Sequence, residues 1–153
     1  CLSTLHANNA NQAIERIINF FPDDRKKQLL MDLSLNLKAV ISQRLLPKKS
    51  GKGRVAAIEI LINTPLIADL IHKGDVGEIK DVMKKPNEVG MRTFDQHLLE
   101  LFMSEQISLD QALRAADSQN DLRLAIKMAC IQNGIPDPTS ESNGTPNQWS
   151  IQE

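Results

Sequence analysis

His6 is the residue of this chain whose position most suggests chemistry. It follows Ser3 and Thr4 at the end of residues 2–5, which are typical of a β-strand, and it directly precedes a predicted helix. In open α/β folds, polar groups gather at such a junction around anionic ligands, because the helix N-terminus presents unpaired N–H groups. The local chemistry alone favours a structural role for His6 over a functional one. Whether His6 has a functional role therefore has to be judged from the rest of the sequence.

The other histidines and a glycine-containing turn have simpler explanations. His72 falls near the end of a predicted helix, where a cation is favourable, and His97 shares a helix with buried leucines. We interpret both as structural. The turn at residues 50–53, Ser-Gly-Lys-Gly, lacks the upstream glycine and the hydroxyl after the lysine that a phosphate-binding loop requires. It is interpreted as the tip of a hairpin.

The charge of the whole chain gives no reason to expect nucleic acid or an anionic membrane as a partner. The 18 Lys and Arg residues are balanced by 19 Asp and Glu residues, and the formal net charge is −1. Acidic residues are nevertheless absent between Asp32 and Glu59, a stretch that is rich in Lys and Arg. This stretch is either a local surface for anions or, as its hairpin pattern favours, a solvated hairpin.

The two cysteines, Cys1 and Cys130, lack the spacing of a disulfide framework or of a zinc site, and no metal site is predicted. A reducing cytoplasm is the expectation for such a chain. No apolar run approaches the roughly 20 residues that span a bilayer, and the start lacks the pattern of a signal peptide. Direct membrane insertion is therefore not expected. Because the chain begins with Cys1, two interpretations are open: a lipid-anchored cysteine or a truncated fragment. The sequence that follows Cys1 favours the fragment.

Two amphipathic helices are predicted after His6. Asn8 and Asn9 are suitable N-caps, because their side-chain oxygens accept hydrogen bonds from the first helical turn. Pro22 ends the first helix, and the two acids after it favour the start of the second through its dipole. The apolar residues of the first helix recur at the spacing of one helical face, at Ile14, Ile17, Ile18 and Phe21.

A hairpin and a series of short helices are predicted next. Residues 40–46 and 54–62 have the pattern of strands joined by a polar turn. Ala56, Ile58, Ile60 and Ile62 alternate onto one face of the second strand. Five helices are predicted after the hairpin. Their boundaries are marked by Thr64-Pro65, Gly74, Asp75 with Glu78, capping boxes at Thr93 and Ser108, and Asn120-Asp121.

The composition of the chain changes at its end. Residues 134–153 contain three prolines, several Ser, Thr and Asn residues, and no Lys or Arg. Such a segment buries too little apolar surface to offset the entropy of ordering it. We therefore predict a disordered tail at residues 134–153, preceded by a helical subdomain at residues 63–133.

Several segments resemble one family of bacterial motors. Residues 2–8, Leu-Ser-Thr-Leu-His-Ala-Asn, resemble the His box of type IV pilus and type II secretion ATPases. The hairpin strands, residues 63–65 and residues 91–98, Met-Arg-Thr-Phe-Asp-Gln-His-Leu, are similar to retraction ATPases of the PilT/PilU type. The set covers residues 1 to about 130. Residues 66–73 depart from the PilT signature and residues 115–123 are more similar to PilU, so a PilU-like member is predicted.

The resemblance implies an α/β fold in which residues 1–62 are the end of a RecA-like P-loop ATPase core, including the β-hairpin, followed by an all-α C-terminal subdomain. It implies ATP and Mg²⁺ as cofactors of the full-length parent, with His6 sensing the γ-phosphate. It also implies a hexameric motor for pilus retraction and twitching motility, formed alone or with a paralogous retraction ATPase. Such a motor works at the cytoplasmic face of the inner membrane on the pilus platform protein.

The family's Walker A loop, acidic box and Walker B acid have no counterpart in these 153 residues. Without the P-loop amides, the lysine and the metal-bearing hydroxyl, nothing holds the phosphates or Mg²⁺. The chain alone is therefore not expected to bind ATP and Mg²⁺ or to hydrolyse ATP. The alternative function is a non-enzymatic interaction module that assembles with intact motor subunits.

Overall fold

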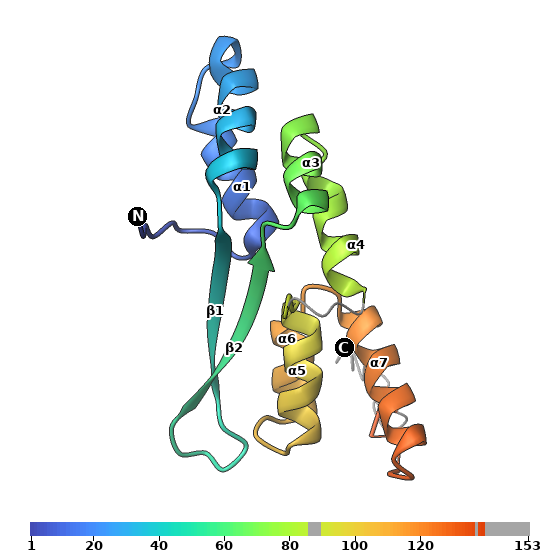
Figure 1. Cartoon of the computed structure of the whole chain (residues 1–153). Coiled ribbons are helices and arrows are strands. Elements are labelled where there is room, and N and C mark those ends of the chain that lie inside the picture. Colours follow the sequence, from blue (N-terminus) through green and yellow to red (C-terminus); the bar gives the residue numbers. More distant parts are fainter. Residues whose placement is uncertain (86–89, 137, 140–153) are drawn as a thin grey trace, which may run out of the picture.

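A long antiparallel hairpin forms the spine of the computed structural model, with helices at one end and along one side (Figure 1). The structure describes residues 1–85, 90–136 and 138–139. Strand β1 spans Ala39–Pro47 and pairs antiparallel with β2, which spans Arg54–Ile62. The tip turns through Gly51 and Gly53 at φ values of 73° and 78°, which glycine adopts without a steric penalty. The predicted hairpin and its tip are confirmed.

Two helices precede the hairpin, α1 at Ala10–Asn19 and α2 at Asp23–Asn36. Asn9 is the N-cap of α1, as predicted, and its side chain accepts a hydrogen bond from the Gln12 N–H at 2.9 Å. Ile14 is fully buried, whereas Phe21 keeps 43% of its surface exposed. Phe21 would belong to the predicted apolar stripe only if the helix continued to it. Because α1 ends at Asn19, Phe21 does not extend this stripe.

The strand predicted at residues 2–5 is wrong for the part of the chain that the structure describes. Residues 1–7 have no regular secondary structure, and Leu2 and Leu5 are exposed. A strand is stabilised by hydrogen bonds to a neighbouring strand. The described sheet consists of β1 and β2 alone, so this segment has the composition of a strand without a partner.

The two faces of strand β2 differ in burial, and its outer edge makes backbone hydrogen bonds. Ala57, Glu59 and Leu61 face the interior and are buried, whereas the alternating face identified in the sequence is only partly buried. Along the edge away from β1, Ile60 and Arg92 exchange two backbone hydrogen bonds of 2.8 and 2.9 Å. Further along the same edge, the backbone N–H of Ile58 donates a hydrogen bond to a histidine ring, so β2 has hydrogen-bond partners on both edges.

Five α-helices follow the hairpin in the described residues, as predicted, with a single turn of 3₁₀-helix, η1 (Val76–Glu78), before the second. They are α3 (Pro65–Lys73), α4 (Ile79–Lys84), α5 (Phe94–Met103), α6 (Leu109–Ala115) and α7 (Gln119–Gln132). The predicted capping boxes at Thr93 and Ser108 are formed, and Gly74 ends α3 in the left-handed conformation. Two predicted starts differ. Asp75 makes no side-chain cap, and α7 is capped by Ser118 instead of opening at Asn120.

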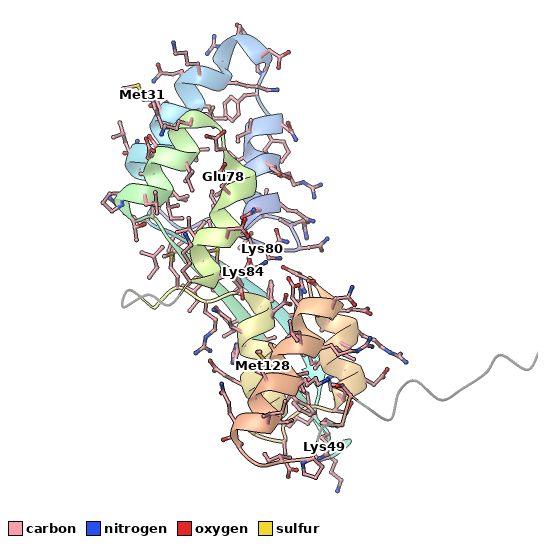
Figure 2. All side chains as sticks on the ribbon, turned by 90° about the vertical axis from the view of Figure 1, so that its right-hand side faces the viewer. Met31, Lys49, Glu78, Lys80, Lys84 and Met128 are labelled. Carbon is pink, nitrogen blue, oxygen red and sulfur yellow. The ribbon has the colours of Figure 1, made fainter. Side chains whose placement is uncertain are left out.

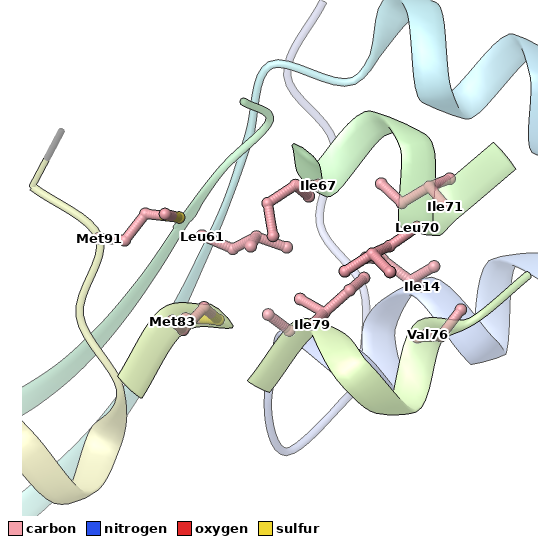
Figure 3. Packing of buried hydrophobic residues seen from close by; sticks show 10 residues of the cluster. Ile14, Leu61, Ile67, Leu70, Ile71, Val76, Ile79, Met83 and Met91 are labelled. Carbon is pink, nitrogen blue, oxygen red and sulfur yellow. The ribbon is translucent and has the colours of Figure 1, made fainter. Parts of the chain in front are cut away.

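Two hydrophobic clusters form the interior. The first joins Ile14 of α1 and Leu61 of β2 to α3, η1 and α4 (Figure 3). The second joins Ala57 of β2 to α5, α6 and α7. Because α3 and α4 pack with α1, the clusters do not follow the predicted boundary after residue 62, and the domain limits stay a prediction. Most of the predicted tail, residues 137 and 140–153, lies outside the described residues.

Candidate functional site

His6 lies on the surface in the irregular stretch before α1. Its backbone carbonyl accepts a hydrogen bond of 2.6 Å from Arg16 Nη1, which ties this stretch to α1. Its imidazole has no hydrogen bond or ion pair with any residue that the structure describes. The described residues therefore place no acid or base against His6, and its γ-phosphate role stays a prediction.

His97 has the structural role expected from the sequence. Its Nδ1 accepts a hydrogen bond of 2.9 Å from the backbone N–H of Ile58, on the outer edge of β2. The ring therefore satisfies a strand N–H that would otherwise lack an acceptor. His72 is exposed in the last turn of α3, where a cation is favourable to the helix dipole.

Arg44 and Asp117, 73 residues apart in the sequence, form the centre of a polar cluster. Arg44 Nη2 lies 2.6 Å from Asp117 Oδ1, and its Nη1 donates to the Ala115 carbonyl at 2.5 Å. The guanidinium also stacks over the Phe94 ring at 4.0 Å from the ring centre. Lys80 of α4 completes the cluster by donating a hydrogen bond to Asp117 Oδ2. Figure 2 labels Lys80 on α4, between the helices before the hairpin and the helices α5 to α7. We call Arg44, Lys80, Phe94 and Asp117 the Asp117 cluster.

The charge state of Asp117 follows from these contacts. Burial alone raises the pKa of Asp117, but the hydrogen bonds and charges of Lys80 and Arg44 outweigh it and lower the pKa below its ordinary value. Asp95 fixes the backbone at this point of the chain. Its two carboxylate oxygens accept hydrogen bonds from the backbone N–H groups of Asp117 and Ser118. The ionised carboxylate therefore holds β1, α4 and the start of α7 in one arrangement.

Glu59 is a second buried acid, with only 2% of its surface exposed. Its Oε1 accepts a hydrogen bond of 2.7 Å from the Ala10 N–H, at the start of α1. The backbone N–H of Phe94, at the start of α5, bonds the same side chain. Burial raises the pKa of Glu59, and the charge of Asp117 adds to the rise. The two backbone hydrogen bonds and Lys80 oppose it. One carboxyl group therefore joins two helices that belong to different hydrophobic clusters.

We predict that Glu59→Gln changes the pH dependence of stability. A raised pKa means that, as pH climbs above the ordinary value of 4.5, the unfolded chain loses this proton before the folded chain does. The folded state is therefore progressively destabilised by Glu59 as pH rises through this window. Relative to the parent chain, the variant should gain stability from pH 4 to pH 7 in urea denaturation.

The exposed helical residue Glu15 supplies the matched control for that experiment. Glu15→Gln should keep the pH slope of the parent chain. A parallel course of the parent and Glu59→Gln curves across the whole range would show that the folded protein does not shift the titration of Glu59.

An open pocket of about 430 Å³ lies beside the Asp117 cluster. Its walls come from the start of α1, from β1, from α4 and from the end of α6. The lining residues are Asn8, Asn9, Gln12, Arg44, Lys80, Arg114, Ala115, Ala116 and Asp117. The first lining residue in the sequence, Asn8, lies two residues after His6. The lining is rich in amide and cationic side chains.

The described residues contain no group of three His, Cys, Asp or Glu side chains that could hold a metal ion. Among them, no helix combines the length and apolar character needed to cross a bilayer. The hairpin tip has the open turn of a loop and not the cradle of a phosphate-binding motif.

Sequence reasoning missed Glu59, Lys80 and Asp117. A signal was present for Glu59, because a single acid within an apolar strand shares its face with Ala57 and Leu61. No local signal pointed to the ion pairs of Asp117, since its partners are 37 and 73 residues away. Arg44 was grouped with a solvated hairpin or an anion-facing surface. It packs against Phe94 and Asp117 and also lines the open pocket.

The known proteins that resemble the chain include two type IV pilus ATPases. No family model matches. Over 128 residues the chain is 62% identical to the type IV pilus ATPase PilU of Pseudomonas aeruginosa, covering 84% of this chain and 34% of that protein. It is 39% identical to the retraction ATPase PilT of the same organism, covering 74% of this chain and 33% of that protein. The chain thus spans about a third of the length of these relatives.

The fold agrees with these matches. The crystal structure of the retraction motor PilT with bound ADP superposes with a TM-score of 0.68 at 36% identity, covering 76% of this chain and 32% of that one. The chain belongs to the PilT/PilU-type retraction ATPases. The higher identity to PilU confirms the PilU-like prediction within this PilT/PilU-type family. The match to the C-terminal ATPase domain of PilT likewise confirms the predicted mixed α/β class with a helical part.

Proposed function

We propose that this PilT/PilU-type chain is the C-terminal part of a hexameric ATPase motor that powers type IV pilus retraction and twitching motility. The observation that carries the proposal is the 62% identity to PilU over 84% of the chain. The parent protein binds ATP and Mg²⁺, assembles with itself or with a paralogue, and works on the platform protein at the cytoplasmic face of the inner membrane. The ADP bound to the PilT neighbour supports the nucleotide part of this proposal.

The first experiment reads the coding sequence upstream of Cys1. We expect an open frame that encodes a Walker A loop, an acidic box and a Walker B acid, because the phosphates and Mg²⁺ need those groups. A start codon with its own ribosome-binding site directly before Cys1 would contradict the motor proposal. It would favour the alternative, a non-enzymatic module that assembles with intact motor subunits, which is suggested by the missing Walker motifs of this sequence.

We further propose that His6 couples the motor to the γ-phosphate, and we predict that His6→Ala in the full-length parent lowers ATP turnover. The loss of one group that stabilises charge at a transferring phosphoryl should cost about tenfold or more in kcat. Because His6 is exposed in this chain, the substitution should leave folding unchanged. Steady-state hydrolysis and size-exclusion chromatography measure the two effects separately.

A matched histidine serves as the control for this prediction. His72 is also exposed, at the end of α3. His72→Ala should retain the parental kcat. Equal turnover of the His6 variant and the parent ring would remove the proposed role of His6 and leave the family assignment untouched.

A further inference from the structure

The pocket beside the Asp117 cluster has an excess of positive charge. Arg44, Lys80 and Arg114 contribute three cations to its lining, and Asp117 contributes the one carboxylate. Arg114 also pairs with Asp110, which lies outside the lining, but both side chains are mostly exposed and such a pair is weak. The lining therefore carries a net charge of about +2.

Several hydrogen-bond acceptors in the pocket lining are already used. Both oxygens of Asp117 are taken, one by Arg44 and one by Lys80. The Asn9 side-chain oxygen accepts from the Gln12 N–H, and the Gln12 side-chain oxygen accepts from the Asn8 N–H at 3.2 Å. The carbonyls of Asn8 and Ala115 both accept from Arg44.

Several donors in the same lining are unused within the described part of the chain. The amide nitrogens of Asn9 and Gln12 donate to none of the described residues, and neither do the terminal guanidinium nitrogens of Arg114. A pocket that offers donors and positive charge but few acceptors matches a ligand group that only accepts hydrogen bonds and is negatively charged.

A phosphate group fits these requirements better than a carboxylate. At neutral pH a phosphate monoester carries about −1.5 to −2 charges and three strong acceptor oxygens, close to the +2 of the lining. A carboxylate would leave one positive charge uncompensated and presents two oxygens. The pocket volume of about 430 Å³ leaves room for such a group and for what it is attached to.

We propose that this pocket binds a phosphate group, which is either free inorganic phosphate or the phosphate of a nucleotide. This departs from the expectation from the sequence that the chain alone holds no phosphate, because the donors here come from the pocket lining and not from a P-loop. Arg114, Gln12 and Asn9 supply the free donors, and the Asp117 cluster fixes the wall behind them. The proposal does not depend on motor activity, since the pocket lies wholly within this chain. Its failure would leave the family assignment and the motor proposal unchanged.

The test is an NMR titration of the ¹⁵N-labelled chain with inorganic phosphate, with sodium chloride replaced to hold ionic strength constant. We expect saturable shifts at Asn8, Gln12 and Asp117. Arg114→Gln should weaken binding about tenfold, because one charge-assisted hydrogen bond is lost. Arg114 is mostly exposed, so the fold should survive the change. Arg123→Gln, on the exposed side of α7 and outside the lining, is the matched control and should bind as the parent does.

A second variant tests the donor argument directly. Gln12→Glu keeps the side-chain oxygen that accepts from the Asn8 N–H and replaces the donor nitrogen with a charged oxygen. Gln12 is exposed, so the variant should fold and should bind no phosphate. Equal weakening by Arg114→Gln and Arg123→Gln, unsaturated shifts, or binding of acetate as tight as that of phosphate would each overturn the proposal.

The same titration with ADP distinguishes the two sources of the phosphate group. If ADP competes with phosphate and loses affinity with Arg114→Gln, the pocket holds the phosphate of a nucleotide. If inorganic phosphate binds and ADP does not compete, the pocket holds the free ion. Both results support the phosphate site.

Discussion

Phe94→Ala should lower the free energy of unfolding by about 3–5 kcal/mol, the range for truncating a buried phenylalanine. Phe94 has no exposed surface and lies in the cluster that joins β2 to α5, α6 and α7. Its ring also supports the Arg44 guanidinium at 4.0 Å, so the variant loses a cation–π contact together with the buried area. Urea denaturation followed by circular dichroism measures the change.

Two variants give this measurement its controls. Phe20→Ala removes the same atoms from a residue that is 64% exposed, and we expect a change within about 0.5 kcal/mol. Phe94→Leu keeps most of the buried volume and should lose much less stability than Phe94→Ala. If Phe94→Ala and Phe20→Ala were equally stable, the second hydrophobic cluster could not be as tightly packed as described.

Asp117→Asn is expected to have the second largest effect. Removing one partner of a buried ion pair costs about 3–5 kcal/mol, because the remaining charge is left without compensation. We expect about 2–3 kcal/mol here, since the Arg44 and Lys80 side chains are each 24% exposed and water compensates part of the loss. Denaturation of Asp117→Asn, Lys80→Met and the double variant gives the coupling energy of one pair.

The pH dependence of Asp117→Asn has the opposite sign to that of Glu59→Gln. The lowered pKa of Asp117 means that its contribution is present above the ordinary value of 3.8 and is lost as pH falls through the folded-state pKa. The difference between parent and variant should therefore shrink in strong acid. Asp23→Asn, which breaks an exposed pair with Lys26, is the control and should show no measurable change at neutral pH. A constant difference down to pH 2 would contradict the assigned role.

The features that could be predicted from the sequence are those with short-range causes. The caps at Asn9, Thr93 and Ser108 depend on residues three positions apart, and the hairpin depends on alternation along two neighbouring strands. The wrong strand at residues 2–5 shows the opposite case. Its composition is that of a strand, but a strand forms only beside another, and the described residues supply none.

The candidate site was harder to predict for the same reason. His6 was found because of its local position, and its role came from resemblance alone. The Asp117 cluster brings together residues from β1, α4, α5 and the connection before α7. Charge patterns along the chain relate a residue to its near neighbours, so they carry no signal that pairs Arg44 with an acid 73 residues away.

The edge of β2 described above sets the direction in which this sheet can grow. Arg92 and the His97 ring occupy the backbone groups of Ile60 and Ile58 on that side. Extension there would require both to be displaced. Within the described chain, β1 has β2 as its one strand neighbour, so its other edge still offers backbone donors and acceptors. A third strand that joins this sheet must therefore add beside β1.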